Sequence, residues 1–403
     1  MSDRFERLVR GLKERPSVDQ LIPEPELVEK LKKSEETGKP LRIKLGIDPS
    51  APHLTLGHSI PLRKMRQFQD LGHTGVLVVG DFTRRIGDPS GRSSTRALMT
   101  QDDIESNMTT YVEQAFKILD PERTEIRYNS EWLGALTFAD VIDLTAKYTV
   151  ARMLERDDFA KRFAGNLPIS ILEFLYPLAQ AYDSVAIHAD VELGGGDQLF
   201  NLLVGRDIQR EYGQEPQAIL TVPLLIGTDG VRSMSQTVGN YVGIGESPSE
   251  MYGKILSIPD DLLREYFFQL TDLEMTEAES LIESSPRDAK RRLAQEIVTR
   301  YHDKDAAIAA QEEFDRIHIQ HERPSEVPQI EIDRALLKDG SVIWVISLLQ
   351  ASGLVASRGE AKRLIAQGGV KINEERITSP ELELTFDPPM LIQVGKRSFV
   401  EVV

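Results

Sequence analysis

LRIKLGIDPSAPHLTLGHSIPLRKMRQFQDLGHTGVLVVG, residues 41–80, establishes the fold class of this chain. Two apolar runs, Leu41–Ile47 and Gly75–Gly80, have the length and composition of buried strands. Between them, apolar residues recur at helical spacing and predict a helix from about Leu56 to Leu71. A strand, a helix and a second strand of these lengths form a parallel βαβ unit. The stretch therefore predicts an α/β fold with a doubly wound parallel sheet.

Further elements extend this sheet along the chain. Val185–His188 and Ile219–Leu225 are two more strand candidates, with a helix expected between them at 198–212. Residues 1–38 have the composition of charged helices. The first predicted domain, 1–245, holds the N-terminal helices and the sheet, with a largely helical insertion near 133–175. It is followed by a helical domain at 246–320, a linker at 321–340 and a small C-terminal domain at 341–403.

Composition excludes several classes of protein. The 403 residues carry a formal net charge of −16, and such a protein does not coat itself indiscriminately with nucleic acid. From 342 to 403, however, Lys and Arg equal Asp and Glu in number, so this segment repels RNA less. Without cysteine, and with seven histidines that lack metal-ligand spacing, we expect no disulfide and no protein-bound metal. No apolar run approaches the roughly 20 residues of a membrane span, and the first residues lack a signal-peptide pattern, so we expect a cytoplasmic protein.

Polar loops follow the first two predicted strands, where open parallel sheets bind ligands. The first loop holds Asp48 and the turn Thr55-Leu56-Gly57-His58, at a helix N-terminus whose N–H groups favour phosphate. Gly57 would let a nucleotide approach the backbone closely, although a purely structural turn explains the pattern about as well. The second loop fixes Asp88 in a Gly-Asp-Pro turn. A carboxylate there suits an ammonium group, and an Asx turn is the structural alternative.

Two later motifs combine polar groups with apolar surroundings. Tyr176, Gln180 and Asp183 share one helix face by their spacing, so they need one another or a polar ligand as partners. Pro177 indicates a late start or a kink in that helix. The run Gly194-Gly195-Gly196-Asp197-Gln198 follows an alternating strand and suggests close approach of a ligand, with Asp197 suited to ribose hydroxyls. A plain tight turn explains this run equally well.

Residues 357–373 predict a compact cationic module. Arg358 and Lys362 fall on one helix face with Arg363 at its margin, and a Gly-Gly pair then leads into a strand that carries Lys371. The module resembles the S4 RNA-binding domain, which fits about 342–403. A solvated amphipathic helix is the alternative, but the order of helix, Gly-Gly pair and strand favours S4.

Over almost its whole length the chain resembles the tyrosyl-tRNA synthetases, class I aminoacyl-tRNA synthetases of the bacterial type with a C-terminal S4 domain. The resemblance is carried by these motifs: Gly46-Ile47-Asp48-Pro49-Ser50, the Leu-Gly-His turn, Gly87-Asp88-Pro89-Ser90-Gly91, Asn129 with Trp132, Tyr176-x-x-x-Gln180-x-x-Asp183 and Gly196-Asp197-Gln198. It implies a Rossmann-like catalytic domain, an α-helical anticodon-binding domain at 246–320 and an α+β S4 domain. The reaction it implies is attack of the tyrosine carboxylate on the α-phosphate of ATP with Mg²⁺, then transfer of the tyrosyl group to tRNA(Tyr).

The resemblance also implies roles for individual residues. For tyrosine, Asp88, Tyr176 and Gln180 would hold the α-amino group, Asp183 would accept the phenolic proton, Gln198 would contact the carboxyl group, and Thr83 and Asn129 would support the pocket. For ATP, the implied residues are Asp48, Gly57, His58, Gly196, Asp197, Met234 and Gln236, with Ser50, Thr55, Arg232, Ser233 and Ser235 as the catalytic positions of the signature loops. Arg358, Lys362, Arg363 and Lys371 would bind RNA. No side chain need act as a nucleophile, because positioning and charge stabilisation carry the reaction. The implied assembly is a homodimer with its interface around 133–165.

The chain departs from the family mainly on the ATP side. Thr55 replaces the first histidine of one signature, and Ser233 and Gln236 replace both lysines of the other. Each lost charge-assisted contact costs about 2–4 kcal/mol in the transition state. Arg232 is adjacent and can supply one charge, while Arg84 stands where relatives usually have a small residue. Lys44-Leu45 replaces the commoner Tyr-Cys, which leaves Asp183 as the main reader of the phenol.

Two interpretations remain open on sequence alone. The first is an active synthetase whose nucleotide loops use arginine and hydroxyl groups. The second is a paralogue that binds tyrosine and tRNA but has lost or weakened activation. The intact tyrosine motifs favour the first, and the clustering of all losses on the ATP side favours the second. An adenylating enzyme that does not act on tRNA is a more distant alternative, because the S4 segment would then have no purpose.

Overall fold

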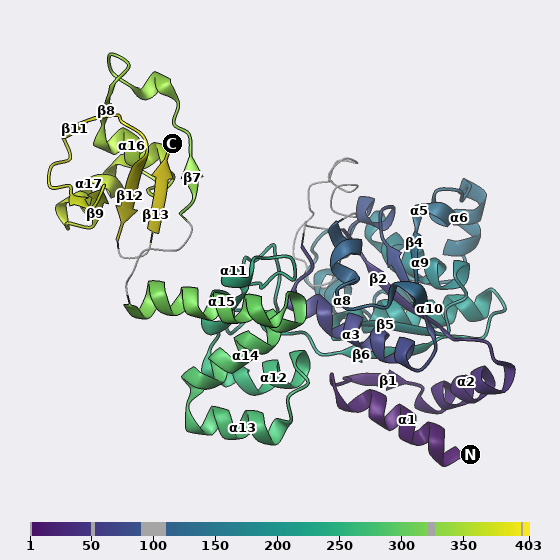
Figure 1. The fold of residues 1–403 in the computed structure, drawn as a ribbon. Helices are drawn as coiled ribbons and strands as arrows, with labels where there is room; N and C mark the ends of the chain where they lie inside the picture. Colours follow the sequence, from purple (N-terminus) through teal and green to yellow (C-terminus); the bar gives the residue numbers. More distant parts are fainter. Residues whose placement is uncertain (1, 50–52, 90–109, 321–326, 396–397) are drawn as a thin grey trace. The chain divides into compact units, whose positions relative to one another are not determined.

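The computed structural model describes residues 2–49, 53–89, 110–320, 327–395 and 398–403 (Figure 1). The chain forms two compact units, Met1–Asp303 and Lys304–Val403. Ser50, one of the predicted catalytic positions, lies outside the described residues, as do Ser90 and Gly91 of the second loop. None of the helices in the described part of the chain combines the length and apolar composition needed to cross a lipid bilayer.

The first unit is built on a six-stranded sheet in the order β1-β6-β5-β2-β3-β4. Its strands are β1 (Gln20–Ile22), β2 (Arg42–Ile47), β3 (Thr74–Val79), β4 (Thr124–Tyr128), β5 (Val191–Gly195) and β6 (Ala218–Val222). β2 pairs in parallel with both β3 and β5, and β4 and β6 continue the parallel ladder on either side. Only the edge strand β1, on β6, is antiparallel among the strands that the structure describes in this sheet. The doubly wound parallel sheet expected from residues 41–80 is therefore confirmed.

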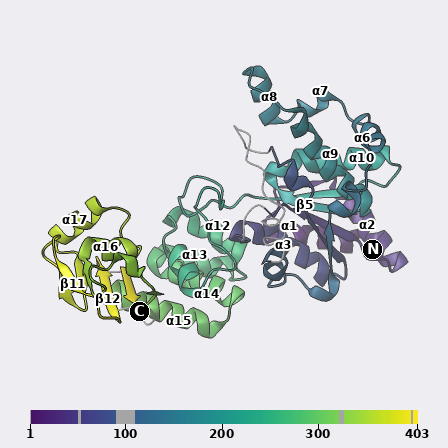
Figure 2. The same cartoon turned by 90° about the horizontal axis from the view of Figure 1, so that it is seen from above.

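The crossovers explain where a ligand can bind. The chain passes from β2 to β3 through α3 (Leu56–Asp70) in one direction, and from β5 to β6 through α10 (Leu199–Glu211) in the other. Because such crossovers are right-handed, the two helices must cover opposite faces of the sheet, as Figure 2 shows. The order reverses between the neighbouring strands β2 and β5, and the carboxyl ends of strands at such a switch point flank a crevice.

The structure corrects three details of the sequence-based expectations. Val185–His188 is not a strand, because α9 (Ile171–Ala186) runs through Val185 and packs it in a core with α10. The strand of that region is instead β5, which extends into the glycine run and ends at Gly195. β1 and β4 were not predicted as strands, and α9 begins at Ile171, ahead of Pro177, so the late start that Pro177 indicated is not observed.

The remaining helices of the first unit flank the sheet or follow it. N-terminal to the sheet are α1 (Ser2–Glu14) and α2 (Glu24–Thr37), and the insertion contains α5 (Ser130–Leu133), α6 (Phe138–Thr145), α7 (Val150–Met153) and α8 (Asp157–Ala164). After the sheet come α11 (Pro248–Leu256), α12 (Leu263–Leu270), α13 (Met275–Ser284) and α14 (Pro286–Tyr301). Short 3₁₀ helices include η1 (Thr83–Arg85) and η3 (Gly196–Gln198).

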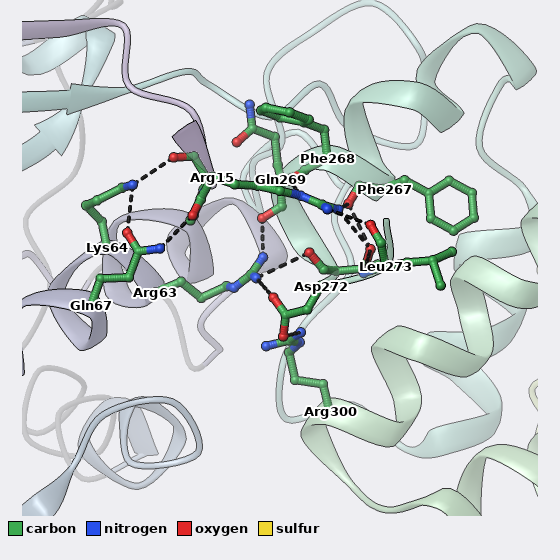
Figure 3. Close-up of polar contacts among 12 residues, drawn as sticks. Arg15, Arg63, Lys64, Gln67, Phe267, Phe268, Gln269, Asp272, Leu273 and Arg300 are labelled. Atoms are coloured by element: carbon green, nitrogen blue, oxygen red, sulfur yellow. Dashed lines mark hydrogen bonds and ion pairs between the residues drawn. The ribbon is translucent and has the colours of Figure 1, made fainter. Parts of the chain in front are cut away.

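Polar contacts fasten α3 to the end of α12 (Figure 3). Arg15, in the turn after α1, donates to the carbonyl oxygens of Phe268 at 2.9 Å, Phe267 at 2.7 Å and Leu273 at 2.5 Å. Arg63 on α3 binds the Gln269 carbonyl and forms an ion pair with Asp272. Cations stabilise the carbonyl end of a helix, so these contacts hold the C-terminus of α12 against the helix that begins at the Thr55 turn.

The second unit contains α15 (Lys304–Asp315), the π-helical turn η5 (Arg316–Gln320), α16 (Val345–Ala351), α17 (Arg358–Ala366) and two small sheets. The five-stranded sheet has the order β10-β9-β12-β13-β7, with β7 (Gln329–Ile330), β9 (Val370–Ile372), β10 (Glu375–Arg376), β12 (Met390–Val394) and β13 (Ser398–Val402), and β8 (Val342–Trp344) pairs with β11 (Glu383–Thr385). β7 pairs in parallel with β13, so part of the expected linker belongs to this sheet. The predicted helix, Gly-Gly pair and strand correspond to α17, Gly368-Gly369 and β9.

Candidate functional site

A cavity of about 660 Å³ opens at the carboxyl ends of β2, β3, β5 and β6. It brings together residues that are far apart in sequence. Its lining includes these predicted site residues: Asp48, Thr55, Gly57, His58, Thr83, Asp88, Asn129, Tyr176, Gln180, Asp183, Asp197, Gln198, Arg232, Ser233, Met234 and Ser235. Gly196 and Gln236 are next to lining residues but do not line the cavity, and the four predicted RNA-binding residues belong to the second unit.

Asp48 is held rigidly just after β2. The Tyr176 hydroxyl donates to Asp48 Oδ2 at 2.9 Å, and Thr83 Oγ1 donates to Oδ1 at 2.9 Å. A side chain at Gly80 would collide with this pair, because its Cβ would lie 2.0 Å from Asp48 Oδ1 and 2.4 Å from Thr83 Oγ1. Burial raises the pKa of Asp48 to about 6, against the opposing effect of the Tyr176 hydrogen bond. The carboxylate is therefore fixed in place and charged at neutral pH.

Asp183 is buried in the last turn of α9, with 3% of its surface exposed. Trp132 Nε1 donates to Oδ1 at 2.7 Å, and Asn129 Nδ2 donates to Oδ2 at 3.3 Å. Burial raises the pKa of Asp183 to about 7, while the positive charge of Lys44 and the two donors act in the opposite direction. A carboxylate has about four acceptor positions, so two donors leave room for a ligand hydroxyl.

A chain of amides connects α9 to the second loop. Asn201 Nδ2 donates to Gln180 Oε1 at 3.2 Å and to Gln198 Oε1 at 3.0 Å, and Gln198 Nε2 donates to Asp88 Oδ2 at 2.8 Å. Burial raises the pKa of Asp197, and the charge of the nearby Asp88 raises it further. This end of the cavity is thus acidic and lined with hydrogen-bonding groups, which suits an ammonium group or hydroxyls.

The N-terminus of α3 forms another wall. His58 Nδ1 accepts the backbone N–H of Thr55 at 3.1 Å, and burial lowers the pKa of His58 to about 4. The imidazole is therefore neutral at neutral pH, and because Nδ1 accepts, the proton lies on Nε2. Together with the positive end of the α3 helix dipole, the Nε2–H donor makes this wall favourable for an anionic group such as phosphate.

The loop after β6 is braced from inside by two side chains. Asp229 Oδ1 accepts the backbone N–H groups of Val231 and Arg232, each at 3.1 Å. Asn240 Oδ1 accepts from the Ser235 N–H at 2.8 Å, and its Nδ2 donates to the carbonyls of Arg232 at 3.1 Å and Ser233 at 3.2 Å. The brace holds Arg232 to Ser235 along the cavity, while the Gln236 side chain turns away to the His53 carbonyl.

Comparison with known proteins identifies the family. The family described as tRNA synthetases class I (W and Y) matches residues 36–318, well over half of the chain. The chain belongs to this family. The S4 domain matches residues 344–387, which confirms that the α16–β11 region is an S4 domain.

Curated relatives and solved structures agree with the class I synthetase assignment. Tyrosine–tRNA ligase of Moorella thermoacetica is 52% identical over 396 residues, covering 96% of this chain and 94% of the relative. The ligase of Thermotoga maritima is 53% identical over 392 residues, covering 96% and 95%. Tyrosyl-tRNA synthetase of Archaeoglobus fulgidus, solved with L-tyrosine, has a TM-score of 0.61 at 20% identity, covering 76% of this chain and 99% of that one. At that identity the solved structure supports the class I fold.

Several residues of the site were not found by sequence reasoning. Asn201 and Arg156 were not singled out, although Asn201 joins two predicted residues and Arg156 lies 3.5 Å from Asp88. Trp132 was noted only as part of a motif, and no role was assigned to it. Lys44 was noted as a departure from the family, and in the structure it lies below the cavity and does not line it.

Proposed function

We propose that this chain is a tyrosine–tRNA ligase that activates L-tyrosine with ATP and Mg²⁺ and transfers it to tRNA(Tyr). The observation that carries the proposal is the buried Asp183 carboxylate, fixed by Trp132 and Asn129 with acceptor positions left over. A buried acceptor rejects an analogue that lacks the hydroxyl by about 10⁴–10⁵-fold, with tyrosyl-tRNA synthetases as the reference example. The curated relatives named above support the same activity.

On the tyrosine side, Asp183 accepts the phenolic proton, and the amino group binds among Asp88, Tyr176 and Gln180. Gln198 contacts the carboxyl group, and Thr83 supports the pocket with Asn129. The chain of hydrogen bonds from Gln180 through Asn201 to Gln198 supports these roles, because it fixes the amides before substrate binds. Fixed groups accelerate the reaction by orienting the carboxylate for attack on the α-phosphate.

On the ATP side, Asp48 and Asp197 bind ribose or flank the adenylate, with Gly57, His58, Gly196, Met234 and Gln236 lining or adjoining the nucleotide. Thr55 and the hydroxyls of Ser50, Ser233 and Ser235 donate hydrogen bonds to phosphate oxygens. Arg232 supplies positive charge to the leaving pyrophosphate, and Arg84, which also lines the cavity, supplies a second charge. Arginine remains charged at all working pH values and binds phosphate with two donors.

We further propose the division into a catalytic region at 1–245, an anticodon-binding region at 246–320, a connecting segment at 321–340, whose β7 joins the C-terminal sheet, and an RNA-binding region at 341–403, in a cytoplasmic homodimer. Four exposed basic side chains would bind tRNA: Arg358, Lys362, Arg363 and Lys371. The dimer is supported by large apolar side chains that stand exposed in and beside the insertion: Phe138, Ile142, Val150, Phe163, Leu167 and Ile171. We propose that these side chains lie in the dimer interface, because contiguous exposed apolar surface marks sites of interaction.

Aminoacylation of a tRNA(Tyr) transcript tests the function. The purified chain is supplied with radiolabelled tyrosine, phenylalanine or tryptophan, since the family contains both tyrosine and tryptophan enzymes. We expect tyrosine alone to be transferred, and an Asp183→Ala variant to lose its preference over phenylalanine. Preferential transfer of tryptophan, or no transfer of any of the three, would overturn the proposal.

A further inference from the structure

A buried ion pair lies directly beneath the candidate tyrosine pocket. Lys44 on β2 and Glu192 on β5 are 0% and 1% exposed, and Lys44 Nζ lies 2.8 Å from Glu192 Oε1. Neither residue lines the cavity. Placing two charges in the interior costs free energy unless both are paired and hydrogen-bonded. A buried pair at this place is therefore expected to support the residues that line the cavity above it.

The pair holds Gln180 at two points. Lys44 Nζ donates to the Gln180 carbonyl at 2.8 Å and to Ser184 Oγ at 2.8 Å. Glu192 accepts from Gln180 Nε2 at 3.3 Å and from Ser184 Oγ at 3.2 Å, and it also accepts from Gln217. The backbone and the side chain of Gln180 thus both depend on the pair, which fixes this turn of α9 against the sheet.

The arrangement reaches both ends of the pocket. From Gln180, hydrogen bonds continue through Asn201 and Gln198 to Asp88 at the amino end. In the other direction, Asp183 follows Gln180 on the same helix, and the charge of Lys44 acts on its carboxylate. A displacement of Gln180, or a change in the charge of the pair, therefore alters the two places where the amino group and the phenol of tyrosine would bind.

We propose that Lys44 and Glu192 are positioning residues for tyrosine specificity: they orient Gln180, and the charge of Lys44 keeps Asp183 in the carboxylate form that accepts the phenol. The inference rests on the proposed function and deepens it. The carboxylate form matters because Trp132 and Asn129 already donate to both oxygens of Asp183. A proton on either oxygen would oppose one of these donors and weaken acceptance of the ligand hydroxyl.

The groups that face Asp183 determine the direction in which each residue of the pair shifts the pKa of Asp183. They are Lys44 from β2, Glu192 from β5, Asn129 and Trp132 from the β4–α5 region, and Tyr176 from α9 itself. Burial raises the pKa of Asp183, Lys44 lowers it by more than Glu192 raises it, and the two donors lower it as well. Neutralising Lys44 must therefore raise this pKa, and neutralising Glu192 must lower it.

The test measures the dissociation constants of L-tyrosine and L-phenylalanine from pH 5.5 to 9 by calorimetry. The ratio of the two dissociation constants reports on the group that binds the phenolic hydroxyl, because both ligands share the same amino and carboxyl groups. The proteins are the parent, Lys44→Met, Glu192→Gln, the double variant, and Lys30→Met as a control. Lys30 is a buried lysine, 3% exposed, paired with Glu215 at 3.1 Å outside the pocket.

We expect the parent's preference for tyrosine to fall with decreasing pH as Asp183 is protonated. The midpoint should move up by about one pH unit in Lys44→Met and down by a smaller amount in Glu192→Gln, with a loss of about fivefold in preference at pH 7 for Lys44→Met. Lys30→Met should lower the melting temperature without moving the midpoint. If Lys44→Met does not fold, the double variant should still give a midpoint above the parent's.

Midpoints that stay in place, or that move in the same direction in Lys44→Met or the double variant as in Glu192→Gln, would overturn the inference and leave the proposed function intact. A parent that does not prefer tyrosine over phenylalanine at any pH would instead refute the proposed function. The two failures are therefore distinguishable within one experiment.

Discussion

Replacing Trp132 by phenylalanine removes one hydrogen bond to Asp183 and little else. The ring packs against Val76, Val78, Ile187 and Ala189, and phenylalanine preserves most of that contact. What is lost is the Nε1–H group, 2.7 Å from Asp183 Oδ1. A hydrogen bond to a charged group contributes about 1.5–3 kcal/mol, and one pKa unit corresponds to about 1.4 kcal/mol.

The expected pKa of Asp183 therefore rises by about one to two units from its value of about 7. At pH 7 the ionised fraction falls from about one half to about one tenth or less, so tyrosine affinity should fall by about 5- to 50-fold. Phenylalanine affinity should stay within about twofold, since it makes no bond to the carboxylate. At pH 9, where Asp183 ionises again, much of the tyrosine affinity should return.

Titration calorimetry with both amino acids at pH 7 and pH 9 checks this prediction. The matched control is Arg127→Ala, which removes the guanidinium stacked 5.3 Å from the Trp132 ring but leaves the Nε1–H bond in place. An equal loss of tyrosine affinity at both pH values, or no loss at all, would show that the hydrogen bond does not set the state of Asp183.

Three further predictions concern other parts of the chain. Lys362→Glu or Arg363→Glu should leave adenylate formation unchanged and weaken tRNA charging by about tenfold or more, because both side chains are exposed on α17; equal loss in both assays would exclude an RNA-binding role. Asn240→Ala should slow tyrosine-dependent pyrophosphate exchange by about tenfold without changing tyrosine affinity, since it releases the loop brace; an unchanged rate would contradict that role. Arg63→Ala should lower the free energy of unfolding by about 2–3 kcal/mol in urea titrations, because the Gln269 carbonyl at the end of α12 loses its charged donor and Asp272 loses one of its two arginine partners, Arg63 and Arg300; a change below about 0.5 kcal/mol would contradict it.

The local sequence pattern was sufficient to predict β2, α3 and β3, which lead to the switch point of the sheet. The apolar runs of β2 and β3 and the helical spacing of α3 were long enough to identify each element and its order. The three-residue β1 is too short to produce a pattern, and it exists because β6 offers it an edge to pair with. Val185–His188 was misassigned because its β-branched residues favour a strand, whereas packing against α10 keeps Val185 helical.

The same distinction applies to the candidate site. Tyr176, Gln180 and Asp183 were identified together because helical spacing alone places them on one face. Trp132, Asn201 and the partner of Lys44 depend on contacts between elements that are far apart in sequence. The Lys44–Glu192 pair arises only because β2 and β5 are neighbours in the sheet. A single sequence holds no local signal for such a pairing.

Tyrosine-dependent ATP–pyrophosphate exchange by the purified chain, beside the variant Ser233→Lys/Gln236→Lys, is the decisive measurement. It asks whether the loop with Arg232, Ser233 and Gln236 activates tyrosine without the two lysines usual in the family. The account predicts robust exchange by the unaltered chain that depends on tyrosine and is absent with phenylalanine. Tyrosine binding without exchange in the unaltered chain, restored by the two lysines, would contradict it.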